Sequence, residues 1–256
     1  MLANYSCINI CQNKNNNDNK TMSTQNRLNR VTNKIITGHE NSSFRKSRFH
    51  DAKGNFIGWS RLIKHTPIAV MTTLARVLFG YRFQLPWISY QSIFLFNSFL
   101  NKDKCVFEFG SGMSTVWYAK HSKFVTAVED DGDWYAMIDK SIKTMDIVNV
   151  DYIFCESAED YTSIISKKDT KFDLIVVDGS CRDVCMQNAI KFVNIGGIIY
   201  LDNSDAYAYH DLNNDHVRQA EITAIEFARK NNFKFEFVTD FSPGQLFVHQ
   251  ALIIFC

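Results

Sequence analysis

The stretch CVFEFGSGMST, residues 105–115, decides how the chain folds. Its first five residues are a short β-rich apolar run, two glycines follow, and Ser114 or Thr115 can cap the helix that begins after them. Gly110 and Gly112 permit a positive φ and let a ligand approach the main chain closely. The stretch therefore predicts a strand, a glycine turn and a helix, with the turn at the ligand-binding edge of a doubly wound sheet.

The alternation of strand and helix continues to the end of the chain. The first five β-rich runs are continuously apolar, which is typical of a parallel sheet covered on both faces. The last two runs are too close for a crossover helix, so one of them must run antiparallel. The sequence predicts a three-layer α/β sandwich with strands at 105–109, 123–129, 150–156, 172–178, 196–202, 233–238 and 246–255.

Two side chains near the glycine turn indicate which ligand it suits. A dinucleotide turn of the form G-x-G-x-x-G would need glycine where Thr115 stands. Glu108 precedes the first glycine by two residues, where it would repel a pyrophosphate but suit the ammonium group of an amino-acid ligand. The turn therefore favours an amino-acid ligand, and a nicotinamide-dependent dehydrogenase is the less favoured alternative.

Polar residues also follow the second and third predicted strands. Glu129 ends the second strand, where a carboxylate can accept both ribose hydroxyls of a nucleoside. Asp130 follows it and is a neighbouring candidate, although acidic residues here also suit the start of the next helix. After the third strand, Glu156 or Ser157 is positioned to meet an adenine amino group.

Four segments together carry a family resemblance, in order and with ordinary spacing over residues 86–256. They resemble the motifs of class I S-adenosylmethionine-dependent methyltransferases: EFGSGMSTVWYA, VTAVEDDGDWY, FDLIVVDGS and GGIIYLDNSD. The resemblance implies a Rossmann-like sheet of seven mostly parallel strands with an antiparallel last strand. It also implies that S-adenosylmethionine lies across Gly110, Ser111 and Gly112, with its ribose on Glu129. Ser114 stands where many members of the family have a third glycine.

Methyl transfer requires the acceptor to be aligned with the methyl group and, for a hydroxyl acceptor, the removal of a proton. Candidate bases follow the fourth and fifth predicted strands: Asp178, Asp205 and, in the next loop, His210. Asp178 ends an apolar run at the sheet edge, so we expect it to face both donor and acceptor. An aspartate in that position can also cap a helix, and a lone histidine is often an ordinary surface residue.

A metal site is a further possibility at this edge. Asp178 with Asp202 and Asn203 is similar to the oxygen ligands that hold magnesium in catechol O-methyltransferase-like enzymes. Oxygen ligands suit Mg²⁺, and a bound metal lowers the pKa of an acceptor hydroxyl. The Asp-Asn pair is a common dipeptide, however, and metal-free relatives keep the aspartate after strand 4. Both a metal-dependent and a metal-free site therefore stay open.

The sequence predicts a methyltransferase for a small-molecule acceptor, with a hydroxyl oxygen as the preferred target. The alternatives are a nucleic-acid or protein methyltransferase, or a binding module without catalysis. The formal net charge of +1 gives no clear sign of a nucleic-acid partner. VVDGS also stands where methylation of base amino groups would need N/D-P-P-Y/F.

The N-terminal part differs in composition from the rest. Residues 1–48 hold eight basic and two acidic side chains and the low-complexity run QNKNNNDNK, which predicts a disordered tail or, alternatively, a basic arm. Residues 49–103 form a predicted helical cap with one or two short helices, followed by a helix that starts at Pro86. The cap is expected to cover a pocket or to form a homodimer surface. Residues 104–256 form the predicted methyltransferase domain.

The sequence also bears on location. The N-terminus lacks the basic segment and apolar core of a secretory signal. No run reaches the ~18–20 apolar residues that a bilayer crossing needs, and Ile68–Phe79 is interpreted as a buried or interfacial helix. Seven cysteines without a CxxC pair fit a reducing compartment. We expect a soluble, cytoplasmic protein.

Overall fold

The computed structural model describes residues 34–37, 44–81, 83–208 and 215–256. Most of the predicted tail, residues 1–33 and 38–43, therefore lies outside the described residues. The predicted base His210 lies outside them as well.

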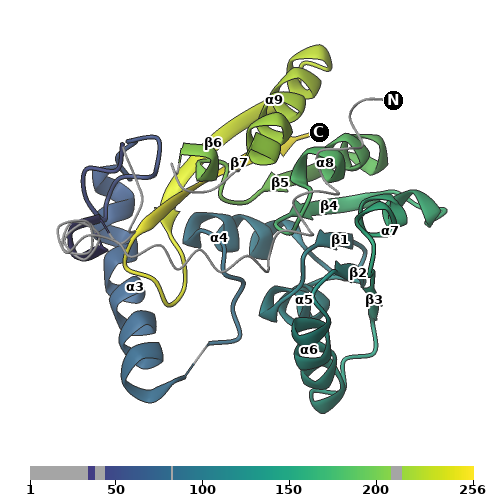
Figure 1. Cartoon of the computed structure of the whole chain (residues 1–256), viewed down its shortest axis with the longest axis horizontal. Coiled ribbons are helices and arrows are strands. Elements are labelled where there is room, and N and C mark those ends of the chain that lie inside the picture. The colour runs from purple at the N-terminus through teal and green to yellow at the C-terminus, as the bar shows by residue number, and fades with distance from the viewer. Residues whose placement is uncertain (1–33, 38–43, 82, 209–214) are drawn as a thin grey trace, which may run out of the picture.

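A single mixed sheet of seven strands forms the centre of the molecule (Figure 1). Its spatial order is β3-β2-β1-β4-β5-β7-β6. Six strands run parallel and β7 runs antiparallel to both of its neighbours, which confirms the predicted sheet. The strands are β1 (Cys105–Phe109), β2 (Phe124–Glu129), β3 (Val150–Phe154), β4 (Phe172–Val177), β5 (Val193–Leu201), β6 (Lys234–Phe241) and β7 (Val248–Phe255).

Helices cover both faces of the sheet, so the predicted three-layer sandwich is confirmed. Strand residues alternate between two buried clusters: Val106 packs with the first helical layer, and Phe107 packs with the second. The first layer contains α3 (Trp59–Phe79), α4 (Tyr90–Phe99), α5 (Met113–His121) and α6 (Gly132–Thr144). The second contains α7 (Ala158–Ser163), α8 (Arg182–Phe192) and α9 (Asp215–Lys230).

The helices of the predicted cap differ from expectation. α3 is one continuous helix of 21 residues that includes Pro67, where the sequence predicted one or two short helices. The next helix does not start at Pro86. It starts at Tyr90, because the Ser89 side chain caps it by accepting a hydrogen bond from the Ser92 amide at 3.1 Å.

The ordered structure begins before the predicted boundary at residue 48. Arg45 is only 4% exposed, and it donates to the carbonyl oxygen of Val248 in β7 at 2.8 Å. Asp51 is fully buried and accepts hydrogen bonds from Thr239 Oγ1 at 2.7 Å and Gln250 Nε2 at 3.1 Å. Residues 44–57 are thus fastened to β6 and β7, at the edge of the sheet.

Candidate functional site

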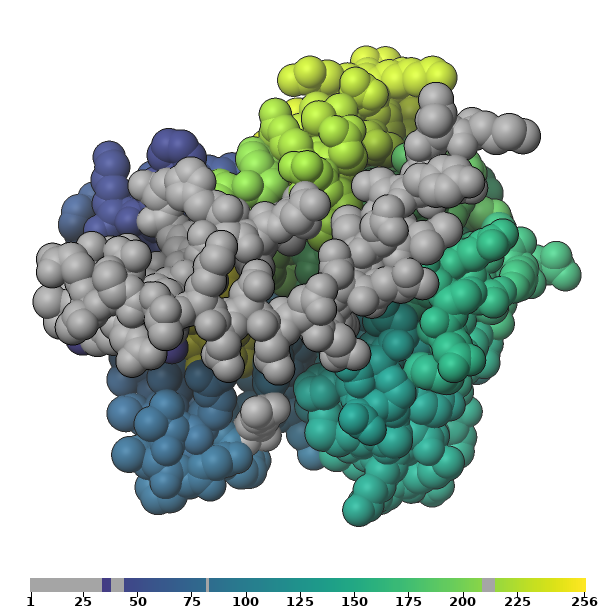
Figure 2. Space-filling view, viewed as in Figure 1, coloured from purple at the N-terminus to yellow at the C-terminus, as the bar shows by residue number. Residues whose placement is uncertain are grey.

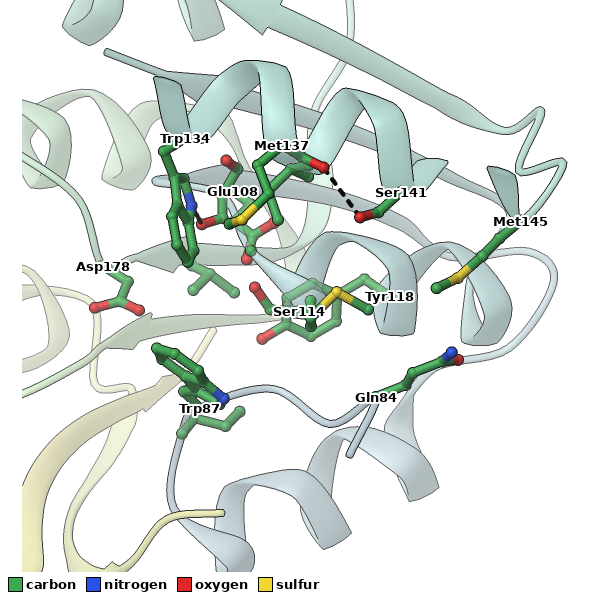
Figure 3. Close-up of a pocket in the computed structure, with 16 residues that line it drawn as sticks. Gln84, Trp87, Glu108, Ser114, Tyr118, Trp134, Met137, Ser141, Met145 and Asp178 are labelled. Carbon is green, nitrogen blue, oxygen red and sulfur yellow. Dashed lines mark hydrogen bonds between the residues drawn. The ribbon is translucent and has the colours of Figure 1, made fainter. Parts of the chain in front are cut away.

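A cavity of about 300 Å³ lies beside the carboxyl ends of β1 and β4 (Figure 3). The glycine turn, the first turns of α5, the length of α6 and the segment before α4 form its walls. The cap segment therefore does line a pocket, as expected. The lining residues are Gln84, Trp87, Ile88, Glu108, Ser111, Gly112, Met113, Ser114, Tyr118, Trp134, Met137, Ile138, Ser141, Met145, Val176 and Asp178.

The period of the strands brings three carboxylates to one corner of this cavity. Glu108 follows Val106 by two residues, so both point to the first helical layer. By the same alternation, Asp178 after β4 and Asp202 after β5 point to that face of the sheet. Glu108 is 1% exposed, Asp202 is 4% exposed, and the Asp178 side chain is 39% exposed.

Glu108 lies deepest in this corner. One carboxylate oxygen accepts a hydrogen bond from Thr115 Oγ1 at 2.6 Å. The pKa of Glu108 is raised to about 8, chiefly by burial; hydrogen bonds from Ser114 and Thr115 oppose the rise, and the nearby Glu129 adds to it. Glu108 is therefore largely neutral at pH 7 while no cation lies beside it.

Tyr118 stands next to Glu108 in the cavity wall. Its hydroxyl is buried and has no hydrogen-bond partner among the described residues. Burial raises the pKa of Tyr118 well above its ordinary value, and the carboxylates Glu108, Asp178 and Asp202 add to the rise. A buried hydroxyl without a partner beside a cavity is a polar contact that a ligand can complete.

Asp178 and Asp202 form a second acidic group, at the ends of β4 and β5. Burial raises the pKa of both side chains, while the Arg182 guanidinium lowers it. Arg182 donates to Asp178 at 3.2 Å, and the Tyr200 hydroxyl donates to Asp202 at 2.7 Å. One cation thus faces two carboxylates, and the corner keeps an excess of acidic groups.

Gly110, Gly112 and Thr115 have different roles in the turn after β1. Gly110 has a φ of 84°, and a Cβ there would meet the backbone of Gly179 at 2.8 Å, so the neighbouring turn as well as the conformation requires glycine. Gly112 has an extended φ of −179° and is itself the N-cap of α5. Thr115 contributes from inside the helix, because its Oγ1 accepts from the Gly112 amide at 3.2 Å. The prediction that Ser114 or Thr115 caps this helix is confirmed for Thr115, which forms a capping box with Gly112.

Glu129 lies behind the turn and is 6% exposed. Its carboxylate accepts hydrogen bonds from the amide and hydroxyl of Ser111 at 3.1 and 2.6 Å. It also accepts from the amides of Asp130 and Asp131, both at 3.0 Å. The helix start here is capped by Asp131, whose side chain accepts from the amides of the first turn of α6. Glu129 therefore holds two loops together at the place predicted for a ribose.

The residues predicted to meet adenine are both exposed. Ser157 is the N-cap of α7, and its hydroxyl accepts from the Asp160 amide at 3.1 Å. Neither Glu156 nor Ser157 lines the cavity beside Glu108. They stand at the end of β3, on the far side of β2 from the cavity corner.

Asp205 has a structural position. It is fully buried, and its carboxylate accepts from the amides of Ala52 at 2.7 Å and Gln250 at 3.2 Å. Arg45 lies 3.8 Å from the same carboxylate. Asp205 does not line the cavity. The sequence predicted a catalytic role for Asp205. In the structure its contacts join residues 44–57 to β7.

The predicted metal ligands come together, but their donor atoms do not fit a magnesium ion. The Asn203 amide donates to one oxygen of Asp202, while Tyr200 donates to the other. The remaining aspartate, Asp178, pairs with Arg182, and a guanidinium at this distance competes with a metal cation. The described residues contain no group of three His, Cys, Asp or Glu side chains placed to bind a metal.

Several wall residues were missed by sequence reasoning. Trp134 lies in the first turn of α6 and donates from Nε1 to the Ser111 carbonyl at 2.8 Å. Its ring faces that of Trp87 with centroids 6.4 Å apart. The signal for Trp134 was available, since a residue in the first turn after Glu129 has to lie at the carboxyl edge. Trp87 comes from the cap, where the sequence predicted pocket walls, and its aromatic side chain had already suggested a planar acceptor.

Comparison with known proteins supports the fold. No protein-family model and no curated protein sequence matches this chain. Among solved structures, an O-methyltransferase from Bacillus cereus in complex with SAH is 16% identical, with a TM-score of 0.57; the match covers 76% of this chain and 100% of that one. The cofactor-bound protein Rv0187 from MTB is also 16% identical, with a TM-score of 0.56, over 74% of this chain and 97% of that one.

The structural neighbours include other kinds of methyltransferase. An rRNA methylase from Streptococcus thermophilus is 12% identical over 65% of this chain and 94% of that one, with a TM-score of 0.48. The neighbours with higher TM-scores, together with the sheet order and the single antiparallel strand, show that the chain has the Rossmann-like fold of class I methyltransferases.

The raised pKa of Glu108 predicts a pH-dependent stability. Its pKa is about 8 in the folded chain against an ordinary value of 4.5, so the stability linked to its protonation is complete below pH 4.5 and is lost as the pH rises through 8. We expect Glu108→Gln to remove a fall of order 2–4 kcal/mol in the free energy of unfolding between about pH 5 and 9. Urea denaturation across this range measures the difference. The same pH dependence of stability in the parent chain and in Glu108→Gln would contradict the raised pKa of Glu108.

Proposed function

We propose that the protein transfers a methyl group from S-adenosylmethionine to a small-molecule acceptor, with a hydroxyl oxygen as the target. The observation that carries the proposal is the acidic corner of the cavity. Glu108 and Asp178 line it, Asp202 lies beside Asp178, and Arg182 is the cation near the two aspartates. A donor with an ammonium and a sulfonium group supplies the positive charge that this corner lacks, whereas a pyrophosphate would be repelled.

The donor would be held by the carboxyl ends of four strands. Glu108 receives its ammonium group, and the turn formed by Gly110, Ser111 and Gly112 passes beneath it, with Ser114 and Thr115 at the start of α5. Glu129 accepts the ribose hydroxyls once the Ser111 hydroxyl no longer donates to it. The Ser111 hydroxyl then keeps its second partner, the Tyr152 hydroxyl. Asp130 stands next to the ribose. Glu156 and Ser157 lie at the end of β3, where the adenine would reach.

The acceptor would lie between the donor and the tryptophan pair. Trp87 and Trp134 give this part of the cavity flat apolar walls, and Met113 and Met137 extend them. Asp178 is the proposed base, because it lines the cavity and burial raises its pKa above the ordinary value of an aspartate, which makes it a stronger base. His210 stays a second proposed base, in a segment outside the described residues.

The location of the protein is part of the proposal. The proposed location is the cytoplasm, because seven cysteines, an odd number without a CxxC pair, fit a reducing compartment.

Donor binding itself tests the proposal. Because Glu108 is protonated at pH 7 and must ionise to hold an ammonium group, binding of S-adenosylhomocysteine should release roughly one proton. Calorimetry in buffers of different ionisation enthalpy measures that number. Glu108→Gln should release none and should bind ~10- to 100-fold more weakly. Unchanged affinity in Glu108→Gln would exclude this mode of binding.

The base is tested by separating turnover from donor affinity. Asp178→Asn keeps the size of the side chain but cannot take a proton, so turnover should fall ~10²-fold or more while the affinity for S-adenosylhomocysteine changes less than about tenfold. Formation of S-adenosylhomocysteine with a panel of hydroxylated acceptors reports turnover. The exposed Asp169→Asn is the matched control. Equal turnover in Asp178→Asn and the control would transfer the role of base to another residue.

Metal dependence is tested with a chelator. Since the oxygens of Asp202 are already bound by Tyr200 and Asn203, no step of the proposed reaction passes through a metal. We expect the same turnover in EDTA as in added Mg²⁺. Loss of turnover in EDTA that Mg²⁺ restores would show that Asp178, Asp202 and Asn203 rearrange around a metal.

A further inference from the structure

The outward face of α3 is apolar along its whole length. Six large apolar side chains, together with the exposed Pro67, lie within one side of a helix that is ~31 Å long. α3 projects as a ridge at the lower left of the molecule (Figures 1 and 2). We call this surface the α3 stripe; it consists of Trp59 (72% exposed), Ile63 (75%), Met71 (52%), Leu74 (48%), Val77 (67%) and Leu78 (65%).

The inward face of α3 anchors the helix to the domain. His65 and Thr72 are buried, and their side chains bond to Asp240 of β6 at 2.8 Å and to Tyr90 of α4 at 2.8 Å. By length and composition α3 is the one described helix that passes the test for a membrane span, although only 17% of the tested window is buried in the protein. A crossing would break both buried contacts. The contacts leave α3 able to lie on a surface, with the stripe outward.

The charged residues next to α3 in the sequence all have one sign. Residues 52–102 contain six lysines and arginines and no aspartate or glutamate. Three of these cations, Arg61, Lys64 and Arg76, belong to α3. The residues after position 48, taken together, have more acidic than basic side chains, so this segment is the exception within the folded part. A helix with an exposed apolar face, in a segment whose charged residues are all cations, is complementary to a surface that is apolar inside and anionic at its border.

A groove at the N-terminal end of α3 has the same charge. It has a volume of about 510 Å³ and is lined by Trp59 of the stripe together with Arg61, Lys64 and His65. The first turn of α3 opens into it without a side-chain cap. Asp240 binds Nδ1 of His65, while the buried Nε2 has no partner among the described residues. These groups suit a phosphate.

We propose that α3 is a docking site for an anionic phospholipid surface. The α3 stripe lies among the acyl chains just below the headgroups, Arg61, Lys64 and Arg76 lie at the level of the phosphates, and the groove at the helix start holds one headgroup phosphate. The protein binds peripherally, so it stays a soluble chain.

A second copy of the chain is the other occupant expected for this face. Two α3 helices packed by their stripes would bring two cationic segments together, with no carboxylate on α3 to compensate. A lipid surface supplies the opposite charge. The proposal does not depend on the methyl-transfer activity, and its test reads membrane binding alone.

The test is vesicle flotation of the full chain with phosphatidylcholine vesicles and with vesicles containing 30% phosphatidylglycerol. We expect the chain to float with the anionic vesicles at low salt, and at least tenfold less with the neutral ones. Ile63→Gln with Leu78→Gln should lower anionic binding at least tenfold. The matched control is Val148→Gln with Ile195→Gln, which removes two exposed apolar side chains elsewhere (84% and 94% exposed) and should float as the parent does.

The charges are tested separately. Lys64→Gln with Arg76→Gln should abolish the preference for anionic vesicles, whereas Lys143→Gln with Lys234→Gln, which removes two exposed cations elsewhere, should not. Circular dichroism confirms that each variant is folded. Failure of the parent chain to float, or equal flotation of the stripe variant, would overturn the proposal.

Two further outcomes would assign the face to another occupant. A dimer in light scattering that Ile63→Gln with Leu78→Gln dissociates, without vesicle binding by the parent, would identify a second copy. Calorimetric binding of inorganic phosphate that Lys64→Gln abolishes, again without vesicle binding, would identify a site for a free phosphorylated compound. Either result would contradict membrane docking.

Discussion

The burial of acidic side chains at one corner of the sheet is the constraint on which the rest of the site depends. Glu108, Asp178 and Asp202 each come two residues after a buried strand residue, so their side chains point to the same face of the sheet. Burying these strands side by side therefore brings the three carboxyls together. Removing charged carboxylates from water is costly, and Arg182 compensates only part of that charge. Burial therefore favours the protonated forms of these carboxyls. A cationic ligand can replace the protons, which makes the corner selective for the charge of its ligand.

The surrounding structure keeps this arrangement in place. The turns after β1 and β4 touch through Gly110 and Gly179, whose backbones would collide with any added Cβ. Two separate apolar clusters, one on each face of the sheet, hold the strands in register. Glu129 joins the turn after β1 to the loop after β2. The carboxyl ends of the strands are thus a rigid support, while the cap contributes the variable wall.

The sequence was sufficient wherever side-chain period and strand order decide the outcome. The β-rich runs predicted all seven strands, and Glu108 near the end of β1 and Asp178 directly after β4 both line the cavity. Prediction failed where a tertiary contact decides. Asp205 follows a strand like Asp178 does, but residues 44–57 cover it, and their return to β7 has no local signal. The length of α3 was also missed: where the sequence predicted one or two short helices, one helix continues through Pro67 and is held against β6 by His65.

The central claim is that a buried carboxyl group at the end of β1 recognises a cationic amino-acid nucleoside. The most direct measurement is a crystal structure of the chain with S-adenosylhomocysteine. The account predicts the amino group of the ligand within hydrogen-bonding distance of Glu108 and its sulfur facing the space between Asp178 and the two tryptophans. A ligand bound elsewhere, or one whose amino group points away from Glu108, would contradict it.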